Sequence, residues 1–190
     1  KSFDVELVAG VALNQAIFYA ERRILDSREL LLLSEHDPLV YDAEGAAVRL
    51  SREVVEDGLL LSVDLKQDPV GFAAVRAPSE LSLVPGRLAD PEEFFERISM
   101  PADGKLRLQR GRFYILATRE RVRVPKDFAV EMLPYETSAG EFRAHYAGFF
   151  DPGFGWSPDG RGRGAAAVLE VRPYDDDLII RHGQPICKLA

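Results

Sequence analysis

The sequence has little of the residue types that cross-link a chain or anchor it in a membrane. Its single cysteine, Cys187, excludes an internal disulfide and favours a reducing, cytoplasmic setting. No apolar run approaches the roughly 18 residues that a membrane-spanning helix needs. We therefore expect a protein without a membrane partner, held together by its hydrophobic core.

Histidine is also scarce, which bears on metal binding. The three histidines, His36, His145 and His182, lie far apart along the chain. Together with one cysteine they provide none of the ligand spacings that are typical of zinc sites. We expect no zinc.

Basic residues are outnumbered by acidic ones. The 24 lysines and arginines against 31 aspartates and glutamates give a formal net charge of −7. Because duplex binding rests on a net basic face, long nucleic acid is not an expected partner. At 190 residues, of which 46% are hydrophobic, the chain can form one domain with a real core, with or without an appendage.

The hydrophobic pattern predicts many short strands and few helices. Asp26 is a candidate N-cap for a helix reaching Leu33, and Asp90-Pro91 begins a second predicted helix with acids in its first turn. Such short, regularly spaced strands are typical of a barrel or sandwich. Strands are predicted at Val5–Phe18, Leu59–Leu65, Gly71–Arg76, Leu106–Leu108, Phe113–Thr118, Val122–Val124, Phe128–Met132, Ala166–Val171 and His182–Leu189.

A lone carboxylate interrupts one of these apolar strands. Period-2 alternation puts Glu170 and Arg172 on one face and Leu169 and Val171 on the other. A carboxylate in an apolar strand lowers the stability of the fold, which is expected only where the carboxylate has a function. Glu170 is therefore the first candidate for a catalytic residue. From the residues alone, a solvent-facing Glu–Arg edge strand is the alternative interpretation.

Three stretches, in this order, resemble one known family. They are the acidic turn Phe149–Phe154, the strand Ala166–Val171 and the glycine-led closing strand His182–Leu189. They resemble the core of the trimeric dUTPase-like nucleotide hydrolases and, within these, the dCTP deaminases, in particular the C-terminal module of a long two-module dCTP deaminase. The resemblance implies a mainly β fold, a dUTPase-like (β-clip) distorted barrel with two or three short helices.

The resemblance also gives the candidate residues their roles. Glu170 matches the general base, which takes a proton from the water that attacks C4 of cytosine, so that dCTP and water give dUTP and ammonia without zinc. Asp151 matches the residue that holds the deoxyribose, although Asp-Pro-Gly is equally typical of a plain turn. The backbone at Gly148 and Phe149 is expected to read the pyrimidine edge. Phe154, Arg172 and Gln184 complete the substrate-binding candidates in this part of the chain.

The stretch that matches the family's triphosphate-binding loop has reversed charges at its ends. Residues 136–141 keep two hydroxyl side chains, including Ser138, but Glu136 and Glu141 stand where the family has basic residues. Two carboxylates repel a polyphosphate, and Arg143 just beyond them is the candidate that compensates. We expect Mg²⁺ only as an ion carried in with the nucleotide triphosphate.

The first 25 residues are assigned to a separate part of the chain. Residues 8–16 align with the closing strand at 181–189, so 1–25 is expected to close a preceding module or to form an N-terminal extension, and 26–190 to form the barrel module. Since the family divides its site between subunits, we expect a homo-oligomer, trimeric or pseudo-trimeric. An upstream module would then supply the phosphate loop, this one would supply Asp151 and Glu170, and the chain alone would be an inactive fragment.

Two other functions stay open at this point. Hydrolysis of dUTP to dUMP and pyrophosphate uses the same fold, and Phe154 lies near the position where dUTPases usually carry a tyrosine. A non-catalytic structural or nucleotide-sensing module of the same fold is favoured by Glu136 and Glu141. The Leu169-Glu170 pair in its strand favours the deaminase.

Overall fold

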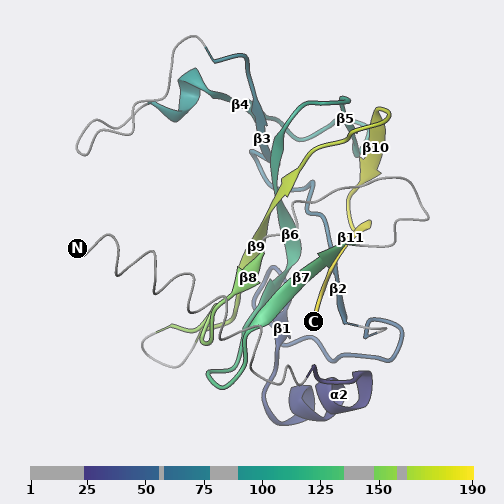
Figure 1. The fold of residues 1–190 in the computed structure, drawn as a ribbon, viewed down its shortest axis with the longest axis vertical. Helices are drawn as coiled ribbons and strands as arrows, with labels where there is room; N and C mark the ends of the chain where they lie inside the picture. The colour runs from purple at the N-terminus through teal and green to yellow at the C-terminus, as the bar shows by residue number, and fades with distance from the viewer. Residues whose placement is uncertain (1–23, 56–57, 78–89, 135–147, 158–161) are drawn as a thin grey trace, which may run out of the picture.

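The computed structural model describes residues 24–55, 58–77, 90–134, 148–157 and 162–190. This part of the chain is mainly antiparallel β structure with one α-helix, which confirms the predicted fold class (Figure 1). The helical elements are α2 (Ser27–His36) and the 3-10 turn η1 (Pro91–Glu93). The strands are β1 (Val40–Tyr41), β2 (Leu59–Ser62), β3 (Gly71–Ala74), β4 (Phe95–Ile98), β5 (Lys105–Leu108), β6 (Tyr114–Val122), β7 (Val130–Pro134), β8 (Phe149–Phe150), β9 (Ala165–Val171), β10 (Leu178–Arg181) and β11 (Pro185–Leu189).

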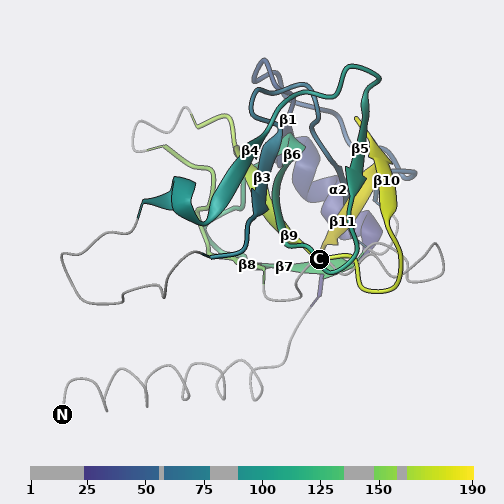
Figure 2. The same ribbon diagram turned by 90° about the horizontal axis from the view of Figure 1, so that it is seen from above.

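The strands form three sheets around one core. In the first sheet β6 pairs with β1, β3 and β9, and β4 extends it beyond β3; the second joins β10 to β5; the third runs β2-β11-β7-β8. Viewed along the long axis, β3, β6 and β9 lie on one side and β5, β10 and β11 on the other (Figure 2). Leu61, Leu108, Leu116, Leu169 and Cys187, drawn from all three sheets, are fully buried between them. The first copy of the predicted repeat, residues 8–16, and the strand predicted at Val5–Phe18 lie outside the described residues.

The predicted first helix is confirmed and continues to His36. Asp26 is its N-cap, and the Asp26 carboxylate accepts hydrogen bonds from the backbone N–H groups of Arg28 and Glu29, both at 2.8 Å. The Glu29 carboxylate accepts in return from the Asp26 N–H at 3.1 Å. This reciprocal capping box satisfies N–H groups that a helix start otherwise leaves without acceptors.

The predicted second helix is wrong beyond its first turn. Asp90 does cap Pro91–Glu93, since its carboxylate accepts from Glu92 N–H at 3.0 Å, but the chain then enters β4. β4 pairs residue by residue with β3, and the ring of Phe95 lies 6.4 Å from that of Phe113. Long-range strand pairing therefore overrides the local helix signal.

The strand predicted at Phe113–Thr118 is present and continues to Val122 as β6, whereas the separate strand predicted at Val122–Val124 is wrong, because Arg123 and Val124 follow the end of β6. The register of β6 against β9 shifts between Ala117 and Arg121, which marks a bulge inside a continuous strand. Thr118, Arg119 and Glu120, which lie between the two predicted segments, form this bulge. The strand predicted at Phe128–Met132 is present as β7, which begins two residues later, at Val130.

The buried thiol of Cys187 gives a direct test of this packing. Burial, together with the charge of Glu120, raises the pKa of the Cys187 thiol from 9.0 to about 12. At pH 8 we expect an aromatic disulfide reagent to react with the native chain at least about a hundredfold more slowly than with the guanidinium-unfolded chain, because both access and thiolate are lacking. The native rate should keep rising with pH toward 12, whereas the unfolded rate levels off near 9. Equal native and unfolded rates at pH 8 would contradict the burial of β11.

Candidate functional site

Glu170 projects from the outer face of β9, as the alternation predicts. Leu169 and Val171 are buried in the core, while Glu170 and its neighbour Val168 are exposed on the other face, Val168 by 63%. Since the buried pair fixes the orientation of the strand, Glu170 cannot turn inward without exposing both apolar side chains. The carboxylate is therefore held outward by the core.

The neighbours of Glu170 across the sheet are apolar. Register pairs Glu170 with Ile115 of β6, Ile115 with Phe72 of β3, and Phe72 with Arg97 of β4. Directly paired residues share a face, so these four form one row, which we call the outer row. Ile115 and Phe72 are partly exposed and Arg97 is exposed. The Glu170 carboxylate thus borders an apolar surface that a second molecular surface can cover.

The Asp151 turn is fastened to the chain that leaves β6. Val124 is the anchor: its N–H donates to Phe154 O at 2.9 Å, and its carbonyl accepts from Gly153 N–H at 3.2 Å and from the Trp156 indole Nε1 at 2.8 Å. The turn itself closes through Phe154 N–H to Asp151 O at 3.0 Å, and Asp151 is exposed. The interpretation of Asp-Pro-Gly as a turn is confirmed.

Phe154 faces the core side of this turn. Its ring packs edge-on against that of Phe150, with centroids 4.7 Å apart, and Phe150 is buried. Phe154 therefore packs on the interior side of the turn, whereas Asp151 is exposed on the other side.

The segment expected to read the pyrimidine edge lies at the start of β8, with Gly148 directly before the strand and Phe149 as its first residue. Phe149 pairs with Glu131 of β7, and the Gly148 carbonyl accepts from Met132 N–H at 2.7 Å. A Cβ at Gly148 would meet the Met132 side chain at 2.9 Å, so glycine allows this close approach. The Phe149 side chain is 54% exposed.

Two further candidates already make local bonds. Arg172 Nε donates to Gly111 O at 2.9 Å, which ties the end of β9 to the turn before β6. Gln184 Oε1 accepts from Arg181 N–H at 3.1 Å within the turn that precedes β11. Ser138 and Arg143 lie outside the described residues.

The Asp151 turn and Glu170 lie near opposite ends of β9. Gly155, in the Asp151 turn, lies against the backbone at Ala165, the first residue of β9. Glu170 follows five residues later, so strand rise puts it about 16 Å further along. In the described part of the chain no hydrogen bond or ion pair connects the two carboxylates.

Sequence reasoning missed a second carboxylate in an apolar strand-like run, Asp64. It is 6% exposed and accepts from Lys66 N–H and Gln67 Nε2, both at 2.8 Å. His182 Nδ1 lies 3.3 Å from its carboxylate and also accepts from Leu65 N–H at 3.2 Å. These bonds connect the chain after β2 to the turn before β11, a structural role. The run Leu61-Ser62-Val63-Asp64-Leu65 carries the same sequence signal as Glu170.

No metal site emerges from the described residues: none of their His, Cys, Asp and Glu side chains gather in groups of three or more that could hold an ion. Within that same part of the chain, no helix has the length and apolar character needed to cross a membrane.

Comparison with known proteins identifies similar sequences and structures. Residues 26–190 match the family described as 2'-deoxycytidine 5'-triphosphate deaminase (DCD), C-terminal domain. The crystal structure of 2'-deoxycytidine 5'-triphosphate deaminase from Agrobacterium tumefaciens superposes with a TM-score of 0.72 at 36% identity, over 87% of this chain and 46% of that one. The chain thus spans less than half of the Agrobacterium protein. No curated protein matches the sequence.

Two glycines of the Asp151 turn form a matched pair for testing its packing. Gly153 (φ +86°) and Gly155 (φ +75°) both have left-handed backbones, but a Cβ at Gly155 would lie 2.1 Å from Val122 O, whereas one at Gly153 meets nothing within 4 Å. We expect Gly153→Ala to lower the free energy of unfolding by about 1–2 kcal/mol, and Gly155→Ala by about 3 kcal/mol or more, because only the second adds a backbone clash. Urea unfolding of both variants measures the difference. Equal losses would show that the turn does not pack against β6.

Proposed function

Because this chain belongs to the family of the C-terminal domain of 2'-deoxycytidine 5'-triphosphate deaminases, we propose that it takes part in the zinc-independent conversion of dCTP and water to dUTP and ammonia. In this proposal it is one module of a longer two-module protein. The nucleotide is its ligand, Mg²⁺ arrives only with the triphosphate, and the reaction takes place in the cytoplasm.

The observation that carries the proposal is the position of Glu170. Its carboxylate is exposed on β9 and borders the partly exposed side chains of Ile115 and Phe72. Asp64, the other carboxylate in an apolar run, is buried, and its oxygens accept hydrogen bonds from Lys66 N–H and Gln67 Nε2, so it has a structural role. Of these two, Glu170 is the one that can reach a ligand.

The proposed reaction requires one general base. The Glu170 carboxylate takes a proton from a water whose oxygen adds to C4 of the cytosine ring. Glu170 passes this proton to N3 of the tetrahedral adduct, then takes the proton of the new C4 hydroxyl and gives it to the amino group, so that ammonia leaves and a C4 carbonyl and an N3–H remain. Water supplies the oxygen and two hydrogens, and dUTP and ammonia account for every atom. Covering the outer row would exclude bulk water from this step.

Substrate binding is proposed to involve residues on both sides of the Asp151 turn. Asp151 would hold the deoxyribose, and the backbone at Gly148 and Phe149 would read the pyrimidine. Ser138 and Arg143 are the proposed phosphate contacts from this chain.

A second module is proposed to complete the site. Three points support this arrangement: the roughly 16 Å of strand between the Asp151 turn and Glu170, the acidic residues Glu136 and Glu141, and the match to less than half of the Agrobacterium protein. A trimeric or pseudo-trimeric assembly would bring a phosphate loop from another module to Glu170 and cover the outer row.

An ammonia-release assay with dCTP and magnesium tests the proposal. In the full-length two-module protein, Glu170→Gln should lower kcat by about 10²–10⁴-fold, because general acid–base catalysis contributes that much. Glu44→Gln is the matched control, since Glu44 is an exposed glutamate in the turn after β1. Near-normal turnover of the Glu170→Gln protein, with folding intact, would remove Glu170 from the mechanism.

The same assay shows whether this chain alone holds a complete site or whether two modules are needed to form it. We expect release by the full-length protein and none by the 190-residue chain. Activity of the chain alone would mean that it holds a complete site and would contradict the divided one. If neither releases ammonia, pyrophosphate release from dUTP tests the diphosphatase alternative, and failure of both assays indicates a structural module.

A further inference from the structure

Positively charged side chains gather at the turn between β10 and β11, although the chain as a whole has a formal net charge of −7. Lys105 of β5 and Arg181 of β10 are direct cross-strand partners, and both are exposed. Their neighbours Leu106 and Ile180 are buried. Strand alternation therefore places Lys105 and Arg181 on the outer face of this two-stranded sheet, with their Cβ atoms about 5 Å apart.

Arg119 brings a third positive charge to the same turn from the first sheet. It is an exposed residue of the β6 bulge. Its Nη1 lies 3.8 Å from the position that a Cβ would occupy at Gly183, two residues after Arg181. We call Lys105, Arg119 and Arg181 the turn cations. They come from three strands and two sheets, and they meet at one short turn.

Hydrogen bonds fix this turn in place. Gly183 N–H donates to Val63 O at 2.9 Å, and Val63 N–H donates to Gln184 O at 3.0 Å. Gln184 N–H in turn donates to Arg181 O at 3.0 Å. The backbone that carries Arg181 is therefore held against the chain after β2, so the turn cations are close together before any ligand arrives.

Three carboxylates close to these residues in the fold already have partners. Asp177 accepts from Arg107 Nε at 2.9 Å and Nη2 at 2.7 Å, and Asp103 accepts from Lys105 N–H at 3.1 Å. The Glu120 carboxylate accepts two hydrogen bonds from β2. In the part of the chain that the structure describes, no ion pair or hydrogen bond involves the side chain of a turn cation. Three positive charges are thus left without a counter-charge.

The number and spacing of the turn cations indicate which anion fits. Like charges on directly paired residues lower the stability of a sheet, and an anion between Lys105 and Arg181 would remove this repulsion. A guanidinium can donate two parallel hydrogen bonds to a phosphate, and an ammonium binds a phosphate as a point charge. A monophosphate carries at most about two negative charges, so neutralising all three cations takes a compact ligand with several phosphates.

An extended acidic peptide is a poorer fit. A strand-like ligand would need cations at every second residue of β5 or β10. The next outward residue of β5, Arg107, is already paired with Asp177, and the next outward residue of β10, Ile179, is apolar and 57% exposed. The unpaired charge is therefore confined to the end of the two-stranded sheet at the β10–β11 turn.

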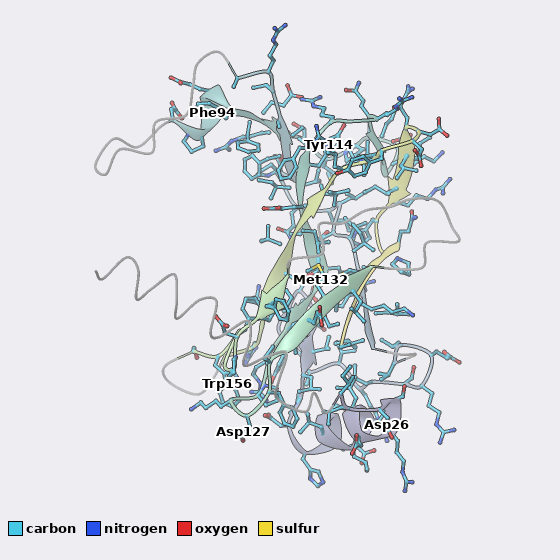
Figure 3. The ribbon with its side chains drawn as sticks, viewed as in Figure 1. Asp26, Phe94, Tyr114, Asp127, Met132 and Trp156 are labelled. Atoms are coloured by element: carbon cyan, nitrogen blue, oxygen red, sulfur yellow. The ribbon has the colours of Figure 1, made fainter. Side chains whose placement is uncertain are left out.

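We propose that the turn cations bind the oligophosphate chain of a small anion, such as inorganic tripolyphosphate or the triphosphate of a nucleotide. None of the turn cations belongs to the residues proposed for deamination. In Figure 3, Tyr114, whose hydroxyl accepts from the Gln109 N–H just after β5 at 2.7 Å, lies toward the end of the molecule that carries β5 and β10. Trp156, in the Asp151 turn, lies toward the other end. The two sites are therefore separate.

Calorimetric titration of the 190-residue chain with tripolyphosphate tests the proposal. Magnesium is left out, since it would neutralise the ligand. At about 50 mM salt we expect a Kd of roughly 1 mM or below, and at about 500 mM salt binding at least about tenfold weaker, because ions screen exposed charges. Monophosphate should bind at least about tenfold more weakly than tripolyphosphate, because it carries less charge.

Charge variants locate the site. Arg181→Gln removes one turn cation and should weaken tripolyphosphate binding about tenfold, because charge-assisted hydrogen bonds are lost. Arg28→Gln makes the same change in net charge on α2, at the end of the molecule that Asp26 marks in Figure 3, and should leave the affinity within about twofold. Arg181→Glu places an opposite charge across from Lys105. Without phosphate its melting temperature should equal or exceed that of the unchanged chain, and tripolyphosphate should no longer raise it.

A titration with dCTP distinguishes the two sources of the phosphate chain. Equal affinities for dCTP and tripolyphosphate, both reduced in Arg181→Gln, would mean that the site recognises phosphate alone. Tighter binding of dCTP, again reduced in Arg181→Gln, would make a nucleotide the ligand. Three results would overturn the proposal: no saturable binding of tripolyphosphate, an unchanged affinity in a folded Arg181→Gln variant, or an equal loss in Arg28→Gln. None of these results depends on ammonia release.

Discussion

The arrangement of this protein depends on the bulge in β6. On one side of it Ala117 pairs with Val168, and on the other Arg121 pairs with Ala166, so Thr118 and the two residues after it lie opposite Ala167 alone. The fully buried Thr118 hydroxyl makes this possible, because it accepts from Ala167 N–H at 2.9 Å and donates to Glu120 O at 2.8 Å. Without it, the bulge would leave a backbone donor unsatisfied in the core. The bulge also sets the register of β9, and a slip by one residue would turn Glu170 into the core.

Carboxylates of similar sequence context therefore end in different physical roles. Glu120 lies in the bulge, and its carboxylate accepts from the Ser62 N–H at 2.7 Å and the Ser62 hydroxyl at 2.6 Å, which joins the first sheet to the third. Asp64 is bound within the chain that connects β2 to β3 and lies beside His182. Glu170 alone of these three is on an outer face. Strand register and bulge position, more than residue type, separate the structural acids from the candidate catalytic one.

The sequence predicts what is local and misses what is assembled from distant segments. The cap at Asp26 and the outward face of Glu170 follow from residues within one helical turn or one strand, so both could be predicted. The fate of the residues after Asp90 could not, because pairing with β3 decides it and lies about twenty residues away in the sequence. The turn cations come from β5, β6 and β10, and no spacing rule relates them. The roles of the site residues rest on the family resemblance, since no pattern in the chain alone assigns a base.

The exposure of Glu170 explains why a single module is an incomplete catalyst under the proposed function. A carboxylate in bulk water is a poor base near neutral pH, and efficient general bases are removed from water. This chain provides the apolar neighbours, Ile115 and Phe72, which remain partly exposed, so in the proposed arrangement a second surface would complete the desolvation. In the proposed arrangement, dividing the site between modules would keep the Glu170 carboxylate solvated until assembly and substrate cover it together. A complete single-module site would instead have to bury an unpaired carboxylate permanently, at a cost in folding stability.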